Sequence, residues 1–227
     1  NIIPNAVDVT HYRGDFGPPE PRTLVFAGAL TYSANYDAAR HLLGDIYPLI
    51  RHVVPEVVLR ITGNTSGVAL TALPHSSGVQ YTGRVPDIRP VVAQSWVSVV
   101  PLRIGGGTRL KILEAMALGT PVVSTAKGAE GLAVQHGRHL LIADEPHEFA
   151  RRVVELLQSP AMRQDFVAAG RELVESRYDW RIVGQDLRTL CAAISDARVA
   201  GSQPAHHDDQ RDTIDADRPA AAEQKRT

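Results

Sequence analysis

Short apolar runs alternate with helical stretches along most of this chain, and four of the six apolar runs end at a residue that breaks regular structure. The expected strands are Thr23–Ala27, Val57–Thr62, Val79–Tyr81, Trp96–Val100, Pro121–Ser124 and Leu140–Ile142. The first four are followed directly by Gly28, Gly63, Thr82-Gly83 and Pro101. Because parallel strands need long right-handed crossovers, this alternation predicts an α/β domain with helices on both faces of a parallel sheet. Such a fold binds its ligand at the carboxyl ends of the strands.

Helical periodicity fills the intervals between these strands. The expected helices cover 38–49, Asp87–Ser95, Thr108–Leu118, His147–Leu157, Ala161–Ser176 and Trp180–Ile194. From Ala200 onward Ile214 is the one large apolar residue, so too little apolar surface is available to offset the entropy of ordering. Residues 197–227 are therefore expected to form a disordered polar tail.

Charge and cysteine content exclude several classes of protein. The 227 residues carry 24 Lys and Arg against 25 Asp and Glu, which gives no basic field for nucleic acid or an anionic membrane. The longest apolar run, Val91–Leu102, is too short for a transmembrane helix. Cys191 is the single cysteine, which excludes an internal disulfide and a cysteine-rich zinc site and predicts a cytoplasmic location.

The segment from Arg103 to Gly119 joins a strand end, three consecutive glycines and a helix for which Thr108 is the expected N-cap. Glycines allow close backbone approach, and the free N–H groups at a helix start attract anions. Leu110 stands where both a P-loop and a dinucleotide-binding loop need a further glycine, so neither class is indicated. On the glycines alone, an ordinary tight turn into a buried helix explains the pattern equally well.

Glu114 changes this balance. At 100° per residue it falls between Leu110 and Leu118, beside the apolar face expected from Leu110, Leu113 and Ala117. A carboxylate facing inward needs hydrogen-bond donors or a charge partner. An i, i+3 pair with Lys111 would contribute only about 0.2–0.5 kcal/mol. A ribose offers two hydroxyl donors, so anion binding at the helix start and a sugar one turn later together predict a nucleotide.

The run Leu110–Val123 closely resembles the signature of the C-terminal, donor-binding lobe of retaining glycosyltransferases with the GT-B fold, of the group 1 or family 4 type. Shorter matching stretches follow the same order along the chain, at Ile3–Asp8, Thr82–Asp87, Gly128–Leu132 and Tyr178–Trp180. The resemblance implies a Rossmann-like lobe over residues 23–196, with residues 1–22 as the end of an interdomain segment. On this resemblance, the N-terminal acceptor lobe is expected to lie outside this sequence.

The resemblance also implies a ligand, a nucleotide-diphosphate sugar of the UDP or GDP type, and no metal. Glu114 would bind the ribose, Gly63, Arg84 and Val85 would border the base, and Gly28 would form the loop after the first strand. The residues implied for the diphosphate are Arg103, Gly106, Gly107, Thr108, Arg109 and Lys111. Fixed cations and the helix N-terminus would stabilise the leaving diphosphate. No catalytic nucleophile is expected in this lobe.

Two positions depart from the family pattern. Gly106 stands where the family often has a second glutamate that contacts the transferred sugar, and Ala34 or Asn35 stands where it often has a lysine. Arg103, Arg109 and Lys111 would then supply the positive charge.

Three interpretations follow from these residues. The favoured one is a transferase lobe that is inactive without its N-terminal lobe, which would bring the acceptor and any peripheral membrane contact. The alternatives are a degenerate nucleotide-sugar-binding module and a GT-B nucleotide-sugar epimerase.

Overall fold

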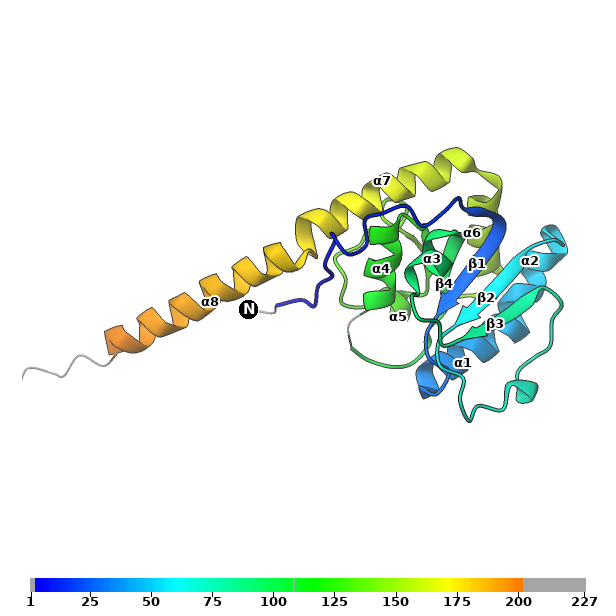
Figure 1. The fold of residues 1–227 in the computed structure, drawn as a ribbon, viewed down its shortest axis with the longest axis horizontal. Coiled ribbons are helices and arrows are strands. Elements are labelled where there is room, and N and C mark those ends of the chain that lie inside the picture. Colours follow the sequence, from blue (N-terminus) through cyan, green and yellow to red (C-terminus); the bar gives the residue numbers. More distant parts are fainter. Residues whose placement is uncertain (1–2, 108, 202–227) are drawn as a thin grey trace, which may run out of the picture. The chain divides into compact units, whose positions relative to one another are not determined.

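The computed structural model describes residues 3–107 and 109–201. Within them, strands in the order β3-β2-β1-β4-β5-β6 form one six-stranded sheet in which every neighbouring pair is parallel (Figure 1). The strands are β1 (Glu20–Ala27), β2 (Val58–Thr62), β3 (Val79–Gly83), β4 (Ser95–Val100), β5 (Val122–Ser124) and β6 (Leu141–Ile142). The predicted parallel α/β fold is confirmed. β1 begins three residues before the expected start at Thr23, because Glu20 already pairs with Ser95.

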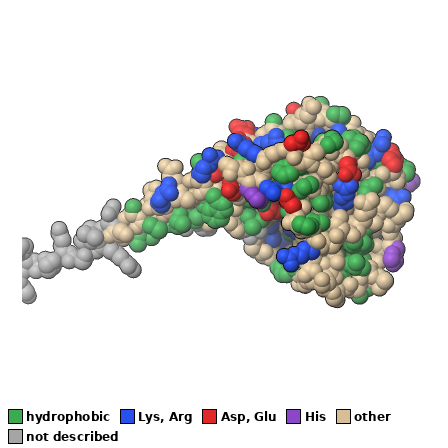
Figure 2. Space-filling model, viewed as in Figure 1, with side chains coloured by type: hydrophobic (Ala, Val, Ile, Leu, Met, Phe, Trp, Pro, Cys, Tyr) green, Lys and Arg blue, Asp and Glu red, His purple; other side chains and the backbone are tan. Residues whose placement is uncertain are grey.

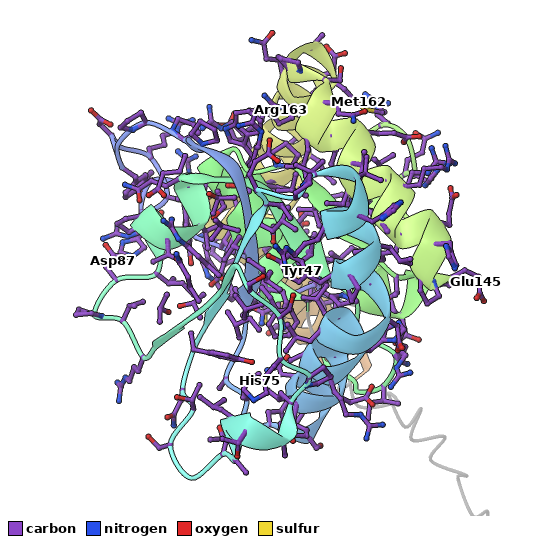
Figure 3. The ribbon with its side chains drawn as sticks, turned by 90° about the vertical axis from the view of Figure 1, so that its right-hand side faces the viewer. Tyr47, His75, Asp87, Glu145, Met162 and Arg163 are labelled. Atoms are coloured by element: carbon purple, nitrogen blue, oxygen red, sulfur yellow. The ribbon has the colours of Figure 1, made fainter. Side chains whose placement is uncertain are left out.

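Helices cover both faces of the sheet (Figure 1). One face carries α1 (Ser33–His41), the π-helical turn η1 (Leu42–Ile46), α2 (Tyr47–Val53) and α6 (Pro146–Gln158). The other carries α3 (Arg89–Ala93), α4 (Leu110–Leu118) and α7 (Pro160–Arg177). The remaining helical segments are η2 (Leu70–Ala72), α5 (Ala126–Ala129) and α8 (Trp180–Gly201). The core includes fully buried Phe26, Tyr47 and Phe149, and Figure 3 shows Tyr47 between the helix layer and the strands.

Two expected helices differ from the structure for local reasons. The helix expected at 38–49 begins at Ser33 and is interrupted by η1, because Pro48 has no N–H for a regular helical hydrogen bond. The helix expected at Asp87–Ser95 shortens to α3. Asp87 remains outside it and accepts the amide of Arg89 at 2.9 Å, while Ser95 begins β4.

The chain divides into two units, Asn1–Thr189 and Leu190–Thr227, so the compact part ends before the expected boundary at residue 196. In the second unit, residues 190–201 are helical, which corrects the prediction that disorder begins at residue 197. Ala192, Ala193, Ala197 and Ala200 favour this continuation, because alanine is the strongest helix former. The rest of the predicted tail, residues 202–227, lies outside the described residues. No helix in the described part of the chain is long and apolar enough to cross a bilayer.

Candidate functional site

The carboxyl ends of β1 and β2 are followed by Gly28 and Gly63, so no side chain separates the two backbones there. The amide of Gly28 donates to the carbonyl of Thr62 at 2.8 Å, and the amide of Gly63 donates to the carbonyl of Gly83 at 3.0 Å. Gly63 has φ +134°, and a Cβ built on it would lie 2.5 Å from the carbonyl oxygen of Gly28. Glycine is therefore required at residue 63 for these two strand ends to approach.

The glycine loop links β4 to α4. Gly105 and Gly107 adopt φ values of +99° and +86°, in the left-handed region that favours glycine, whereas Gly106 lies outside that region and has open space around its Cα. Thr108, expected as the N-cap and as a diphosphate ligand, lies outside the described residues. Arg109 takes the N-cap position and Leu110 begins the helix, which corrects the predicted start by two residues.

Arg109 is buried beneath the loop, with 5% of its side chain exposed. Its guanidinium donates to the carbonyl of Gly105 at 3.2 Å, to that of Gly106 at 3.3 Å and to the Glu130 carboxylate at 3.3 Å. Its Nε is buried and has no hydrogen-bond partner among the described residues. Arg109 thus fixes the path of the loop from below and places positive charge behind it.

Lys111 reaches across from α4 to α1. Its ammonium donates to Oδ1 of Asn35 at 2.8 Å and lies 5.2 Å from the centre of the Phe26 ring. Burial, with a smaller contribution from the charge of Arg109, lowers the pKa of Lys111 to about 8. This group would gain from an anionic partner, because an anion favours its charged form.

A pocket of about 150 Å³ lies between the glycine loop and α1. Its lining residues are Tyr32, Ala34, Asn35, Leu102, Ile104, Gly105, Gly106, Arg109 and Lys111. Two of the three cations expected at the diphosphate therefore share one pocket. The third, Arg103, is a partly exposed side chain that donates to the Asp37 carboxylate at 2.6 and 3.1 Å and is not among the pocket residues.

Glu114 lies one turn along α4 from Lys111 and is half-buried. The hydroxyl of Tyr12 donates to its Oε1 at 2.9 Å. The simpler alternative, an i, i+3 pair with Lys111, is not seen among the described residues, and the lysine ammonium donates to Asn35 instead. Tyr12 was missed from the sequence because it lies 102 residues before Glu114, in a segment with no pattern of its own.

The surroundings of α4 differ from the expected apolar stripe. Leu113 and Ala117 are buried as expected, but so are Ile112, Ala115, Met116 and Leu118, because α7 covers the side away from the sheet. Leu110, Lys111 and Glu114 are the half-buried residues of the helix, and at 100° per residue they lie along one side. The candidate cation and carboxylate are therefore both half-buried in the first turns of α4, whereas Leu118, at an angle between them one turn further on, is buried.

The residues expected at the base are more open. Arg84 is exposed and Val85 is half-buried, in the turn after Gly83, and neither lines the pocket by the glycine loop. On the face drawn in Figure 2, Lys and Arg side chains are interspersed with Asp and Glu, in keeping with the net charge of −1. In the described part of the chain, no three His, Cys, Asp or Glu side chains gather as a metal site.

Residues 21–159 match the family described as Glycosyl transferases group 1, and the chain belongs to this family. It is 30% identical over 206 residues to the phosphatidyl-myo-inositol mannosyltransferase of Mycobacterium leprae, covering 85% of this chain and 53% of that protein. It is 28% identical over 148 residues to a GDP-mannose-dependent monoacylated alpha-(1-6)-phosphatidylinositol monomannoside mannosyltransferase of Corynebacterium glutamicum, covering 60% of this chain and 39% of that protein.

The fold also matches a solved structure, that of Anabaena HepE in complex with UDP. The TM-score is 0.71 at 16% identity, and the match covers 85% of this chain and 57% of that one. This likeness confirms the Rossmann-like fold of GT-B glycosyltransferases. The chain spans about half the length of the relatives it matches.

Proposed function

We propose that this chain is the C-terminal, donor-binding lobe of a retaining, family 4 glycosyltransferase that transfers a sugar from a nucleotide-diphosphate sugar to an acceptor. The observation that carries the proposal is the placement of Lys111 and Glu114, both half-buried, in the first turns of one helix that follows a glycine loop. An anion site at the start of a helix and a carboxylate one turn later match the phosphate-then-ribose order of a nucleotide.

In this proposal the diphosphate lies in the pocket beside Gly105 and Gly106, with Lys111 as its direct cation. Gly107, Thr108 and the start of α4 would contribute backbone N–H groups, while Arg109 acts through its charge from beneath the loop. Arg103 would reach the diphosphate only after leaving Asp37. Glu114 would accept the ribose hydroxyls, and Gly28, Gly63, Arg84 and Val85 would border the sugar and base.

The proposed reaction depends on how the site stabilises the charge of the leaving diphosphate. When the bond between sugar and diphosphate breaks, negative charge grows on the leaving diphosphate, and the lysine ammonium and the loop amides stabilise it without a metal. The proposed transfer proceeds on one face of the sugar, with the donor phosphate accepting the proton of the acceptor hydroxyl. The acceptor site belongs to the N-terminal lobe, which is the proposed partner of this chain, so the chain alone binds donor without transferring sugar.

The donor is proposed to be of the UDP or GDP type. HepE was solved with UDP, and the Corynebacterium relative is described as GDP-mannose-dependent, so both bases occur among similar proteins. The mannosyltransferase names of two relatives favour transfer over epimerisation or a degenerate binding module. The lone cysteine, Cys191, supports the cytoplasm as the proposed compartment.

The test is calorimetric titration of the purified chain with UDP, GDP, ADP and their common sugar conjugates. We expect selective binding to one base, and a loss of affinity of at least about tenfold in Glu114→Gln, since a hydrogen bond to a charged group contributes about 1.5–3 kcal/mol. Glu145→Gln, which changes an exposed glutamate before α6 labelled in Figure 3, is the matched control. Unchanged affinity in Glu114→Gln would refute the ribose assignment, and the absence of binding to every nucleotide would refute the proposed function.

A further inference from the structure

The N-terminal segment, residues 3–19, places the side chain of Tyr12 against α4. The hydroxyl of Tyr12 donates to Oε1 of Glu114 at 2.9 Å, and no described group donates to the other carboxylate oxygen. Neither the family match, which begins at residue 21, nor the sequence pattern assigns a role to Tyr12.

The segment around Tyr12 is firmly anchored. Val7 and Val9 are buried at 4% and 2% exposure, and the amide of Val7 donates to the carbonyl of Tyr178 at 2.8 Å. On the other side, the Arg89 guanidinium donates to the carbonyl of His11 at 2.7 Å. The backbone just before Tyr12 is therefore held at several points, and the contact with Glu114 is part of the folded lobe.

The chemistry of the pair leaves room for a ligand. Burial, together with the neighbouring Glu114 charge, raises the pKa of the Tyr12 phenol, which therefore stays protonated and acts as a donor. A carboxylate has about four acceptor positions, of which Tyr12 occupies one. The positions that remain can accept two ribose hydroxyls, and the Tyr12 bond fixes the plane in which they point.

We infer that Tyr12 is a positioning residue for ribose recognition: its hydroxyl holds the Glu114 carboxylate in the orientation that accepts the 2′- and 3′-hydroxyls of the donor nucleotide. This inference rests on the proposed function. It differs from two simpler roles, a hydroxyl that merely satisfies a half-buried carboxylate in the fold, and a hydroxyl that occupies the place of the ribose and competes with it.

Tyr12→Phe separates these roles, because it removes the hydroxyl and keeps the ring. We would titrate the wild-type chain, Tyr12→Phe, Glu114→Gln and the double variant with UDP and 2′-deoxy-UDP, and with GDP and 2′-deoxy-GDP. Tyr47→Phe is the matched control, since it removes a buried hydroxyl that donates to the carbonyl of Val57 at 2.7 Å, remote from α4. Thermal unfolding of every variant monitors the fold.

A positioning role predicts that Tyr12→Phe weakens binding of the ribonucleotide by about 5- to 10-fold and reduces the preference for ribo- over deoxynucleotide. In the Glu114→Gln background the same change should have little further effect, because coupled residues are not additive. Tyr47→Phe should lower the unfolding temperature and leave that preference intact.

Two outcomes overturn the inference. An unchanged ribo/deoxy preference in Tyr12→Phe, with or without a lower unfolding temperature, would show that the hydroxyl serves the fold alone. Tighter nucleotide binding in Tyr12→Phe would show that the hydroxyl competes with the ribose. Failure of the proposed function looks different: the wild-type chain would then bind no nucleotide, or Glu114→Gln would keep the wild-type preference, and the inference would fall with it.

Discussion

The Lys111 ammonium is hydrogen-bonded at 2.8 Å to Oδ1 of Asn35, whose amide nitrogen donates in turn to the carbonyl of Ala29 at 3.0 Å. The second bond orients the amide, so its oxygen faces the lysine. A Cβ on Gly28 would lie 2.8 Å from this amide, so the glycine leaves the space that Asn35 fills. By the resemblance to the family, the lysine that it often has would fall at Ala34 or Asn35, and here Asn35 positions a lysine that comes from α4.

The first prediction is a pH dependence of nucleotide binding. Because the pKa of Lys111 is about 8 in the free protein, the ammonium is charged below that pH, and affinity for a nucleoside diphosphate should be nearly flat there. Above it, binding must take up a proton, and affinity should fall by up to about tenfold per pH unit. Calorimetry across this range measures the slope. Lys111→Arg should flatten the profile because arginine stays charged, and an equally steep fall in that variant would assign the titration to another group.

The same lysine should affect stability in the opposite pH direction. Its pKa is lowered by folding from the ordinary value near 10.5 to about 8, so the unfolded chain holds more protons between these values. The Lys111 contribution to the free energy of unfolding should therefore increase as pH rises through this window. Urea unfolding at its two ends, compared with Lys111→Met, checks the sign. A contribution that decreases would contradict the burial of this ammonium.

Neighbouring glycines of the loop should respond differently to substitution. Gly106 has open space and no left-handed φ, so Gly106→Ala, and Gly106→Glu with the glutamate that the family often has, should change stability by less than about 0.5 kcal/mol. Gly107 has φ +86°, and Gly107→Ala should lower the free energy of unfolding by about 1–2 kcal/mol. Chemical denaturation compares them. Equal effects at the two positions would mean that the loop rearranges freely.

Gly63→Ala should be among the most destabilising small changes in the lobe. The alanine would have to adopt a φ of +134°, and its Cβ would lie 2.5 Å from the carbonyl oxygen of Gly28. This oxygen belongs to the backbone and cannot move away as the end of a side chain could. We expect a loss of about 2–4 kcal/mol in the free energy of unfolding. Gly67→Ala, with φ +75° and no atom within 4 Å of its Cβ, isolates the conformational part of this loss. Similar losses in the two variants would rule out the steric clash as the cause.

At the other end of the sheet, where the strands begin, Arg163 supports the fold. It lies near the start of α7 and is labelled in Figure 3. Arg163 and Trp96 both line a pocket of about 440 Å³. Its guanidinium lies 3.8 Å from the centre of the Trp96 ring and donates to the carbonyls of Leu156 and Leu157 at the end of α6. Arg163→Met should lower stability by about 1–2 kcal/mol and leave nucleotide affinity unchanged. Arg151→Met, on the exposed side of α6, is the control, and altered affinity in Arg163→Met would link the two ends of the sheet.

The strands, the sheet and the glycine loop were predictable because each depends on residues that are close together in the sequence: runs of apolar residues and the glycine or proline residues that follow them. The side position of Glu114 was predictable too, since a short range of α4 defines it. Its partner was not, because Tyr12 is 102 residues away, and neither was the bond between Lys111 and Asn35, 76 residues apart. The inward direction of the Arg109 side chain could not be predicted for another reason. An arginine that follows glycines is equally suited to bind a phosphate or to donate to the carbonyls of its own loop.

Because Lys111 and Glu114 both belong to α4, the distance between them is set by this helix alone. Lys111 and Glu114 are three positions apart, which fixes a rise of about 4.5 Å along the axis whatever the surrounding helices do. Under the proposed function, α4 fixes the distance between the group that binds the diphosphate and the group that binds the ribose. Movements of α1 or of a partner lobe would change the affinity for a nucleotide without changing this distance. A longer or shorter link between phosphate and sugar would then be rejected by the geometry of the helix itself.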